Sequence, residues 1–126
     1  MRTRLLVTVL ALVLTPAAAA TPFKATLTAP THTPKVNAYW FYLVHVTRNG
    51  KPIRATVTVQ IVDSFGGVYP VQYDNTIRNI VNRPFSGLFR DYVQFPPESR
   101  GFKLTFRAIV RALHAKVTLT YWVKPR

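Results

Sequence analysis

The amino-acid sequence predicts an all-β domain, an antiparallel sandwich of about seven strands that follows an N-terminal signal peptide. Short runs alternate between apolar and polar residues, which is the pattern of half-buried strands. Glycine, proline and Asn-Gly turn signals separate these runs, and no long stretch shows helical periodicity. Because strands alone must then supply both layers around the core, a sandwich of two sheets is expected.

The first 20 residues are expected to be removed during export. Arg2 and Arg4 form a basic start, the apolar run 5–14 follows, and residues 17–20 are alanines. This order is typical of a secretory signal peptide, and the apolar run is shorter than the ~20 residues that a membrane span requires. We therefore expect a signal peptide over 1–20, one domain over 21–126, a secreted or cell-envelope location, and no stable membrane span after cleavage.

The charge of the sequence is strongly positive. Seventeen Lys and Arg residues oppose four Asp and Glu residues, which gives a formal net charge of +13. Loss of Arg2 and Arg4 with the signal peptide would leave 15 basic and four acidic residues, a net charge of +11. Such a charge favours polyanionic partners, among them wall polymers, anionic lipid and nucleic acid. With no cysteine in the sequence, apolar burial rather than disulfides must stabilise the fold.

Residues 23–28 predict the first strand, because Phe23, Ala25 and Leu27 alternate with polar residues. Two stronger runs, 38–48 and 54–63, form the centre of the expected fold. Each has one apolar face, as a half-buried antiparallel strand requires. The residues expected to face inward are Ala38, Trp40, Tyr42, Val44 and Val46 in the first run, and Ala55, Val57, Val59 and Ile61 in the second.

Between these runs, Asn49-Gly50 supplies the positive φ angles of a tight turn. A hairpin within one sheet would place Val44 opposite Ala55, core face beside core face. Pro52 has no N–H to donate to a ladder, so the connection is alternatively an arch that carries the chain into the second sheet. The pattern leaves both alternatives open.

Residues 64–88 form the least regular segment. VYPVQY (68–73) predicts a short strand that Pro70 limits to a sheet edge. TIRNIV (76–81) predicts a strand or a single helical turn, and NRPFSG (82–87) predicts a loop. The segment is either a functional loop or an ordinary connection of the sandwich.

The last three strands are predicted over 88–95, 102–112 and 115–123. In the first of them Asp91 falls on the apolar side, and we expect it near an end of the sandwich. The other two are strongly alternating. Their inward residues are expected to be Leu104, Phe106, Ala108, Val110, Val117, Leu119 and Tyr121.

The final two strands form a hairpin around Leu113-His114, and their symmetric pairing predicts a basic surface. Apolar residues then oppose apolar residues on the inner side, which supports the register. On the outer side Arg111 opposes Lys116 and Lys103 opposes Lys124, and directly opposed like charges are destabilising. We interpret this side as a site for an anionic polymer, with a solvated, salt-screened face as the alternative. The predicted site consists of Lys103, Arg107, Arg111, Lys116, Trp122 and Lys124.

A second candidate surface lies on the outer side of the run 38–48. Tyr39, Phe41 and Leu43 would make an apolar patch of the kind that binds a partner protein. The alternative is that segment 64–88, or an edge strand, covers these three side chains.

The sequence offers no arrangement for catalysis or for a cofactor. None of the three serines lies in a GxSxG motif, the four carboxylates are isolated, and the lack of cysteine excludes thiol chemistry. His32, His45 and His114 lie on separate segments without a close ligand spacing. Neither a phosphate-binding glycine loop nor the signature of a nucleic-acid-binding module is present. We therefore expect a protein that is not an enzyme and has no cofactor, catalytic residue or metal site.

Five segments carry a resemblance to a known family: VTRNGKPI, ATVTVQIVD, PFSGLFRDYV, GFKLTFRAIV and VTLTYWV. In this order they resemble the small bacterial immunoglobulin-like domains of secreted and surface proteins, including the invasin type. The resemblance covers most of residues 23–123. It implies an immunoglobulin-like antiparallel β-sandwich with Greek-key connections and an arch at Pro52, and it implies no chemistry. Periplasmic copper-handling proteins have a similar sandwich, but their sites use His with Met, and the only Met here is Met1.

We interpret the chain as a secreted, non-catalytic domain that binds an envelope component or a partner protein. The alternative is a basic anion-binding module for cell-wall polymer or extracellular nucleic acid, although no motif supports nucleic acid. A third interpretation is an exported metal carrier that uses the three histidines. A steep salt dependence of polyanion binding would distinguish the second interpretation from the first.

Overall fold

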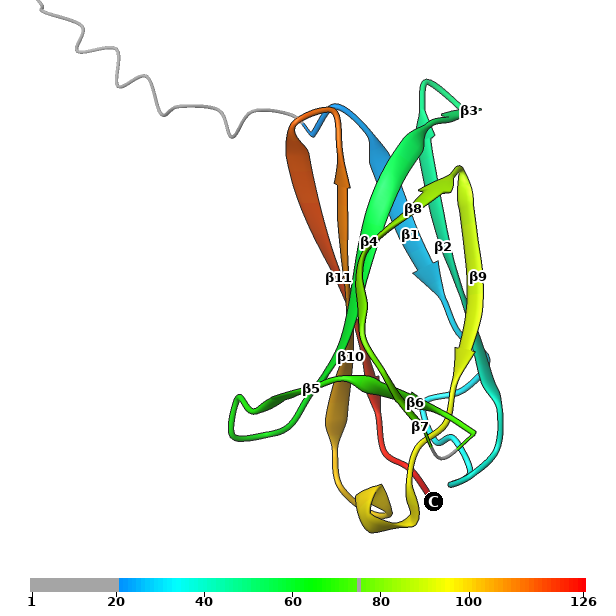
Figure 1. The fold of residues 1–126 in the computed structure, drawn as a ribbon, viewed down its shortest axis with the longest axis vertical. Helices are drawn as coiled ribbons and strands as arrows, with labels where there is room; N and C mark the ends of the chain where they lie inside the picture. The colour runs from blue at the N-terminus through cyan, green and yellow to red at the C-terminus, as the bar shows by residue number, and fades with distance from the viewer. Residues whose placement is uncertain (1–20, 75) are drawn as a thin grey trace, which may run out of the picture.

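The computed structural model describes residues 21–74 and 76–126, which form two antiparallel β-sheets packed face to face (Figure 1). This arrangement confirms the predicted all-β sandwich. The predicted signal peptide, residues 1–20, lies outside the described residues. The elements are β1 (Lys24–Thr28), β2 (Trp40–Arg48), β3 (Lys51–Pro52), β4 (Arg54–Val62), β5 (Val68–Tyr69), β6 (Val71–Tyr73), β7 (Thr76–Arg78), β8 (Ile80–Ser86), β9 (Leu88–Val93), the 3-10 turn η1 (Pro97–Ser99), β10 (Leu104–Ala112) and β11 (Ala115–Val123).

Each sheet is built around one long strand. In the first sheet β2 pairs with β1 on one edge, and with β3 and β9 on the other. In the second sheet the order is β11-β10-β4, and β8 and β5 pair with successive parts of the remaining edge of β4. Strands β6 and β7 form a separate two-stranded hairpin. The central runs of the sequence, 38–48 and 54–63, therefore belong to different sheets.

An arch joins the two sheets. The predicted tight turn is present, because Asn49 and Gly50 have φ angles of 52° and 76° and Arg48 pairs with Lys51. The chain then leaves the first sheet after Pro52 and enters the second at Arg54. A hairpin within one sheet is therefore wrong beyond the turn: Val44 lies opposite Leu27 and Phe89 rather than Ala55. Both central strands, β2 and β4, have one apolar face. Because the two strands face each other across the core, both apolar faces are buried at once.

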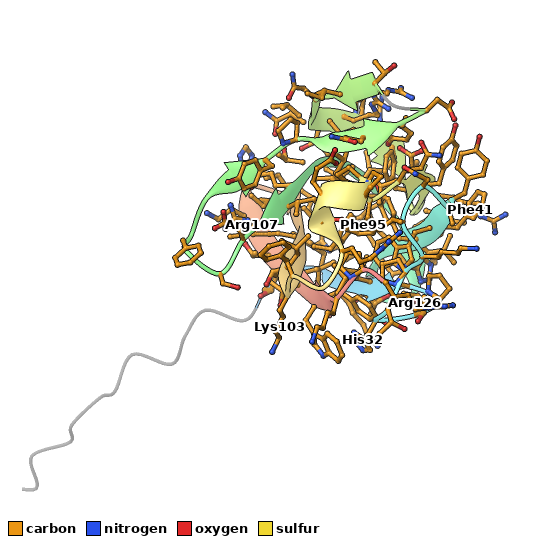
Figure 2. The ribbon with its side chains drawn as sticks, turned by 90° about the horizontal axis from the view of Figure 1, so that it is seen from below. His32, Phe41, Phe95, Lys103, Arg107 and Arg126 are labelled. Carbon is orange, nitrogen blue, oxygen red and sulfur yellow. The ribbon has the colours of Figure 1, made fainter. Side chains whose placement is uncertain are left out.

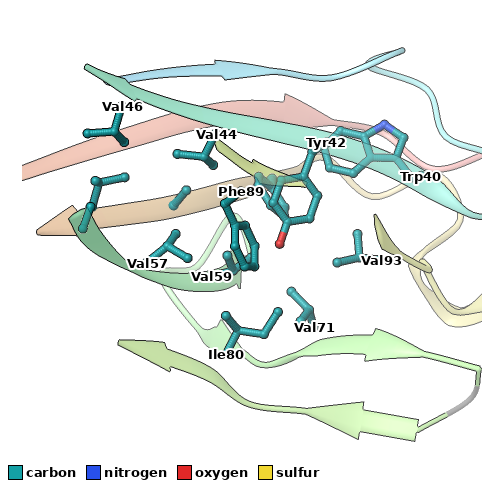
Figure 3. Packing of buried hydrophobic residues seen from close by; sticks show 14 of the residues in the cluster. Trp40, Tyr42, Val44, Val46, Val57, Val59, Val71, Ile80, Phe89 and Val93 are labelled. Atoms are coloured by element: carbon teal, nitrogen blue, oxygen red, sulfur yellow. The ribbon is translucent and has the colours of Figure 1, made fainter. Parts of the chain in front are cut away.

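The core lies between the inner faces of β2, β4 and β10, and Figure 3 shows its side chains meeting between the sheets. The predicted inward residues of β2 from Trp40 to Val46 are buried, as are Phe106, Ala108 and Val110. Ala38 is an exception, because it precedes β2 and is exposed. The predicted inner residues of β11, Val117, Leu119 and Tyr121, are only half-buried, since β11 is the edge strand of its sheet.

Segment 64–88 contains more strand than the sequence predicts. Residues 82–87 were expected to be a loop, but most of them belong to β8, which pairs with β4 from Arg54↔Ser86 to Val59↔Ile80. Pro84 is tolerated there because β8 is itself an edge strand and need not donate from every residue. Asn82 has a positive φ of 47°, and the register shifts between Val57 and Val59, so a local irregularity hides the alternation.

Asp91 faces inward as expected, but it does not lie near an end of the sandwich. It pairs with Tyr42 in the middle of the β2–β9 ladder and is half-buried. Its carboxylate accepts a hydrogen bond from the Tyr73 hydroxyl and another, 2.8 Å long, from the Tyr92 N–H. Hydrogen bonds to its carboxylate oxygens compensate the burial of this acid inside the sandwich.

We predict that Gly87→Ala destabilises the domain through the arch. The N–H of Gly87 donates to the Ile53 carbonyl at 2.9 Å, and a Cβ atom at Gly87 would lie 2.5 Å from the Cβ of Pro52. Gly66→Ala is the matched control, because Gly66 also has a positive φ but no atom within 4 Å of its Cβ position. In urea unfolding, Gly87→Ala should lower the free energy of unfolding by about 1–3 kcal/mol more than Gly66→Ala does. Equal losses would contradict the close contact with Pro52.

We also predict that Tyr42→Phe stabilises the domain. The hydroxyl of Tyr42 is buried and has no hydrogen-bond partner among the described residues. An unsatisfied buried hydroxyl costs about 1–3 kcal/mol, so its removal should raise the free energy of unfolding by about 1 kcal/mol. Tyr73→Phe serves as the control and should lower it, because the Tyr73 hydroxyl donates to Asp91. A loss of stability in Tyr42→Phe comparable to that in Tyr73→Phe would show that the hydroxyl is bonded.

Candidate binding surfaces

The β10–β11 hairpin has the predicted register. Leu113 and His114 form its two-residue turn with positive φ angles of 49° and 59°. Arg111 lies opposite Lys116 and Arg107 opposite Thr120, so these side chains share the outer side of the second sheet. Arg54 at the start of β4 lies on the same side, because Ala55 is buried. We call this outer side, with its cations Arg54, Arg107, Arg111 and Lys116, the basic face.

Neutral amides hold two guanidinium groups of the basic face in place. Arg107 donates from Nε and from a terminal nitrogen to Oε1 of Gln60, at 3.1 and 2.6 Å. Arg111 donates from a terminal nitrogen to Oδ1 of Asn82 at 3.2 Å. Strands β4, β10 and β11 contain neither Asp nor Glu. The guanidinium groups are therefore oriented by amides, and no carboxylate from these strands neutralises their charge.

Three residues of the predicted anion site lie at the end of the hairpin, away from its turn. The ladder ends at Leu104↔Val123, so Lys103 and Lys124 lie one residue beyond it and are not a true cross-strand pair. Lys103 Nζ lies 5.6 Å from the centre of the Trp122 ring. The structure therefore separates Lys103 and Lys124 from Arg111 and Lys116 along the sheet, whereas Trp122 lies next to the Arg107↔Thr120 pair.

Trp122, the one aromatic residue of the predicted anion site, is already stacked on a side chain that the sequence analysis did not connect with it. The His32 ring lies 4.0 Å from the Trp122 ring and 4.0 Å from the Tyr121 ring, nearly parallel to both. His32 Nδ1 is 2.6 Å from the Trp122 carbonyl oxygen. Figure 2 shows His32 and Lys103 on the same side of the sandwich. One face of the indole is thus occupied by His32.

Three of the four acidic residues bind tyrosine hydroxyls. Tyr69 donates to Asp63 at 2.8 Å, Tyr39 donates to Asp74 at 2.9 Å, and Tyr73 donates to Asp91. The bond from Tyr69, helped by the Gly67 N–H, lowers the pKa of Asp63 below its ordinary value. These acids are therefore stabilised by neutral donors, and the positive charge of the cations is left for other partners.

The predicted apolar patch is exposed, and a fourth residue extends it. Tyr39 and Phe41 are each 54% exposed, while Leu43 is half-buried. The Tyr92 ring of β9 lies 4.8 Å from Tyr39 and 5.5 Å from Phe41. The expected cover by segment 64–88 is therefore wrong for Tyr39 and Phe41; Asp74 contacts only the Tyr39 hydroxyl. Tyr92 was missed because the pairing of β9 with β2 has no signal in the sequence.

The three histidines do not converge. His32 stacks beside β11, His45 is exposed on β2, and His114 lies in the β10–β11 turn. Within residues 21–74 and 76–126, no group of three or more His, Asp or Glu side chains is placed to hold a metal ion. The geometry therefore gives no support to a carrier that uses the three histidines.

An additional feature was not predicted. A half-open cavity of about 420 Å³ lies between the β4–β5 turn, β6 and the loop from β9 to β10. Its walls come from segments that are far apart in the sequence, so no local pattern indicates it.

No helix long and apolar enough to cross a membrane occurs in the described part of the chain.

Comparison with known proteins places the chain in no family. No protein-family model matches it, and no curated protein matches it. Among solved structures it is similar to a DUF4426 family protein from Pseudomonas aeruginosa (TM-score 0.48, 17% identity, 83% of this chain and 93% of that chain). It is also similar to a conjugative transposon lipoprotein from Bacteroides eggerthii (TM-score 0.43, 13% identity, 81% and 96%). A β-glucuronidase of glycoside hydrolase family 2 is matched over 11% of its length, with a TM-score of 0.38 and 15% identity over 81% of this chain. All three TM-scores are below 0.5.

We predict that the domain loses stability at alkaline pH. Burial raises the pKa of Tyr42, and burial together with the bond to Asp91 raises that of Tyr73, above their ordinary value. In the unfolded chain both ionise near pH ~10. The contribution of these pKa shifts to the free energy of unfolding is therefore complete below that pH and is lost as the pH rises above it.

Urea unfolding over a pH series, with tyrosinate absorbance followed in parallel, measures this effect. The Tyr42→Phe/Tyr73→Phe double variant should show a flatter decline above pH ~10. An identical decline in both proteins would show that Tyr42 and Tyr73 do not cause the alkaline loss.

Proposed function

We propose that the protein is an exported, non-catalytic domain of the immunoglobulin-like type whose basic face binds an anionic polymer of the cell envelope. Export rests on the composition of residues 1–20, and the domain type on the arch between the sheets and the β10–β11 hairpin. The observation that carries the proposal is the basic face itself: four cations on one outer side, and no acid in β4, β10 or β11.

The pairing of Arg111 with Lys116 supports an anionic ligand. Directly opposed like charges destabilise a sheet, and a bound anion between them would relieve the repulsion. Arg111 and Arg107 use only part of their five donors on Asn82 and Gln60. The remaining N–H groups suit phosphate or carboxylate oxygens, for which guanidinium geometry is well matched.

A polymer fits this face better than a small anion. The cations extend along the second sheet, from Arg54, Arg111 and Lys116 at the end that carries the β10–β11 turn to Arg107 in the middle of β10. Between them lie threonine side chains, such as Thr118 and Thr120, whose hydroxyls donate or accept hydrogen bonds. Repeated weak contacts along a chain of anionic units would use the whole surface.

A second candidate is the binding of a partner protein through the aromatic cluster of Tyr39, Phe41 and Tyr92. It is supported by the exposure of Tyr39 and Phe41, since exposed aromatic groups are typical of interfaces. Figure 2 shows Phe41 and Arg107 on opposite sides of the molecule, so the two surfaces would not compete.

The test compares two variants with the same loss of charge. Arg111→Gln/Lys116→Gln removes the opposed pair, and Lys24→Gln/Lys51→Gln removes two exposed cations of the first sheet. Binding of residues 21–126 to polyphosphate and to DNA is measured over a salt series. The slope of log binding constant against log salt concentration should become shallower by about 1–2 in the first variant. In the second variant it should change by less. Equal effects of the two variants would show that net charge alone determines binding and would reject a defined site.

A further inference from the structure

Two phenylalanines are exposed on neighbouring loops at one end of the sandwich. Phe65 is 98% exposed in the turn between β4 and β5, and Phe102 is 63% exposed between η1 and β10. Both loops lie in the lower half of the molecule in Figure 1. Full exposure of a phenyl ring is unfavourable in water, so two such rings on adjacent loops indicate a surface that is covered in use.

The turn that carries Phe65 is ordered by Asp63. Oδ1 of Asp63 accepts the N–H of Phe65 at 2.9 Å and that of Gly67 at 2.7 Å, and Oδ2 accepts the Tyr69 hydroxyl. Gly66, with a φ of 84°, permits the left-handed conformation that the turn requires. The exposed position of Phe65 is therefore fixed by hydrogen bonds.

The loop that carries Phe102 is ordered as well, and it is joined to the first. The Phe102 N–H donates to the Ser99 carbonyl at 3.1 Å, and the Gly101 N–H donates to the Pro125 carbonyl at 2.8 Å. The Ser64 hydroxyl donates across to the Lys103 carbonyl at 3.1 Å. The two phenylalanines are consequently held in a fixed relation to each other.

The half-open cavity lies between these loops and continues their apolar surface. Its walls include Val71, Phe95 and Leu104. Polar side chains of the wall are bonded to the protein: the Ser99 hydroxyl donates to the Pro96 carbonyl at 2.6 Å, and Gln94 Nε2 donates to the Asn37 carbonyl at 3.2 Å. The surface presented here is therefore mainly apolar.

Cations flank the exposed rings. Arg100 and Lys103 lie on either side of Phe102 in the sequence, and Lys103 and Lys124 each follow one residue beyond the end of the β10–β11 ladder. Two negative charges, those of Glu98 and Asp63, oppose these three cations, and hydrogen bonds hold the Asp63 carboxylate within its own turn. An apolar tip with a positive surround is complementary to an apolar layer beneath anionic groups.

We propose that this end of the sandwich docks on a bilayer surface that carries anionic lipid headgroups. Phe65 and Phe102 enter the interface between headgroups and acyl chains, and Arg100, Lys103 and Lys124 face the headgroups. We call this end the aromatic tip. The proposal goes beyond the polymer-binding function, because the aromatic tip shares no residue with the basic face.

Vesicle flotation of residues 21–126, which contain both sheets, tests the proposal. Vesicles of phosphatidylcholine alone are compared with vesicles that contain phosphatidylglycerol. Phe65→Ser/Phe102→Ser leaves the charge unchanged and should weaken binding to the anionic vesicles at least about tenfold. Val81→Ser/Leu88→Ser, which replaces two exposed apolar residues outside the aromatic tip and the aromatic cluster, is the matched control and should leave binding unchanged.

Both Phe65 and Phe102 are exposed, so the tip variant should fold normally, and its urea unfolding curve verifies this. A Phe65→Trp variant adds a readout of insertion: its tryptophan fluorescence emission should shift to shorter wavelength with anionic vesicles.

Unchanged vesicle binding by the Phe65→Ser/Phe102→Ser variant, or no emission shift in Phe65→Trp, would overturn the proposal. So would vesicle binding that is lost only in Arg111→Gln/Lys116→Gln, which would assign it to the basic face. Failure of polyphosphate binding in the unsubstituted protein would reject the proposed function and leave the aromatic tip unaffected.

Discussion

The arch between β3 and β4 is the constraint on which the rest of the structure depends. The chain turns at Asn49-Gly50 and then crosses to the second sheet, and Gly87 packs against Pro52 at the crossing. Because of this crossing, the apolar faces of β2 and β4 bury each other across the core. Their polar and aromatic faces point in opposite directions. The aromatic cluster on one side and the basic face on the other are both consequences of this single connection.

The distribution of charge follows a second rule, in which acids are paired with tyrosines rather than with cations. Asp63, Asp74 and Asp91 all accept bonds from tyrosine hydroxyls, and the guanidinium groups of Arg107 and Arg111 are held by amides. The described residues carry 15 basic and four acidic side chains, and no carboxylate of β4, β10 or β11 pairs with the guanidinium groups of the basic face. This arrangement favours association with external anions and makes it sensitive to salt.

Much of the sandwich could be predicted because its long strands alternate cleanly. In the β10–β11 hairpin a two-residue turn at Leu113-His114 sets a register that opposes apolar residues throughout, and that register is the one observed. The strand β8 could not be predicted, since Pro84 and the irregularity at Asn82 interrupt its alternation. The stacking of His32 on Trp122 was also unpredictable, because these residues are 90 positions apart and only the tertiary fold brings them together.

The residues of the candidate surfaces also differ in how well the sequence predicts them. The cations of β10 and β11 and the aromatic residues of β2 follow from strand periodicity, whereas the cavity depends on three segments that are far apart in the sequence. The tyrosine–aspartate bonds join residues 6, 18 and 35 positions apart, a spacing with no regular pattern. Side-chain direction within a strand is a local property, but the packing of loops and the pairing of distant polar groups depend on the completed fold.

The central claim is that the basic face acts as one binding surface, and nuclear magnetic resonance of isotope-labelled residues 21–126 tests it most directly. A short polyphosphate is titrated in, and the shifts of the backbone amides are mapped onto the strands. The account predicts shifts concentrated on β4, β10 and β11, centred on Arg107, Arg111 and Lys116. Shifts spread evenly over both sheets, or concentrated on β2 and β9, would contradict it.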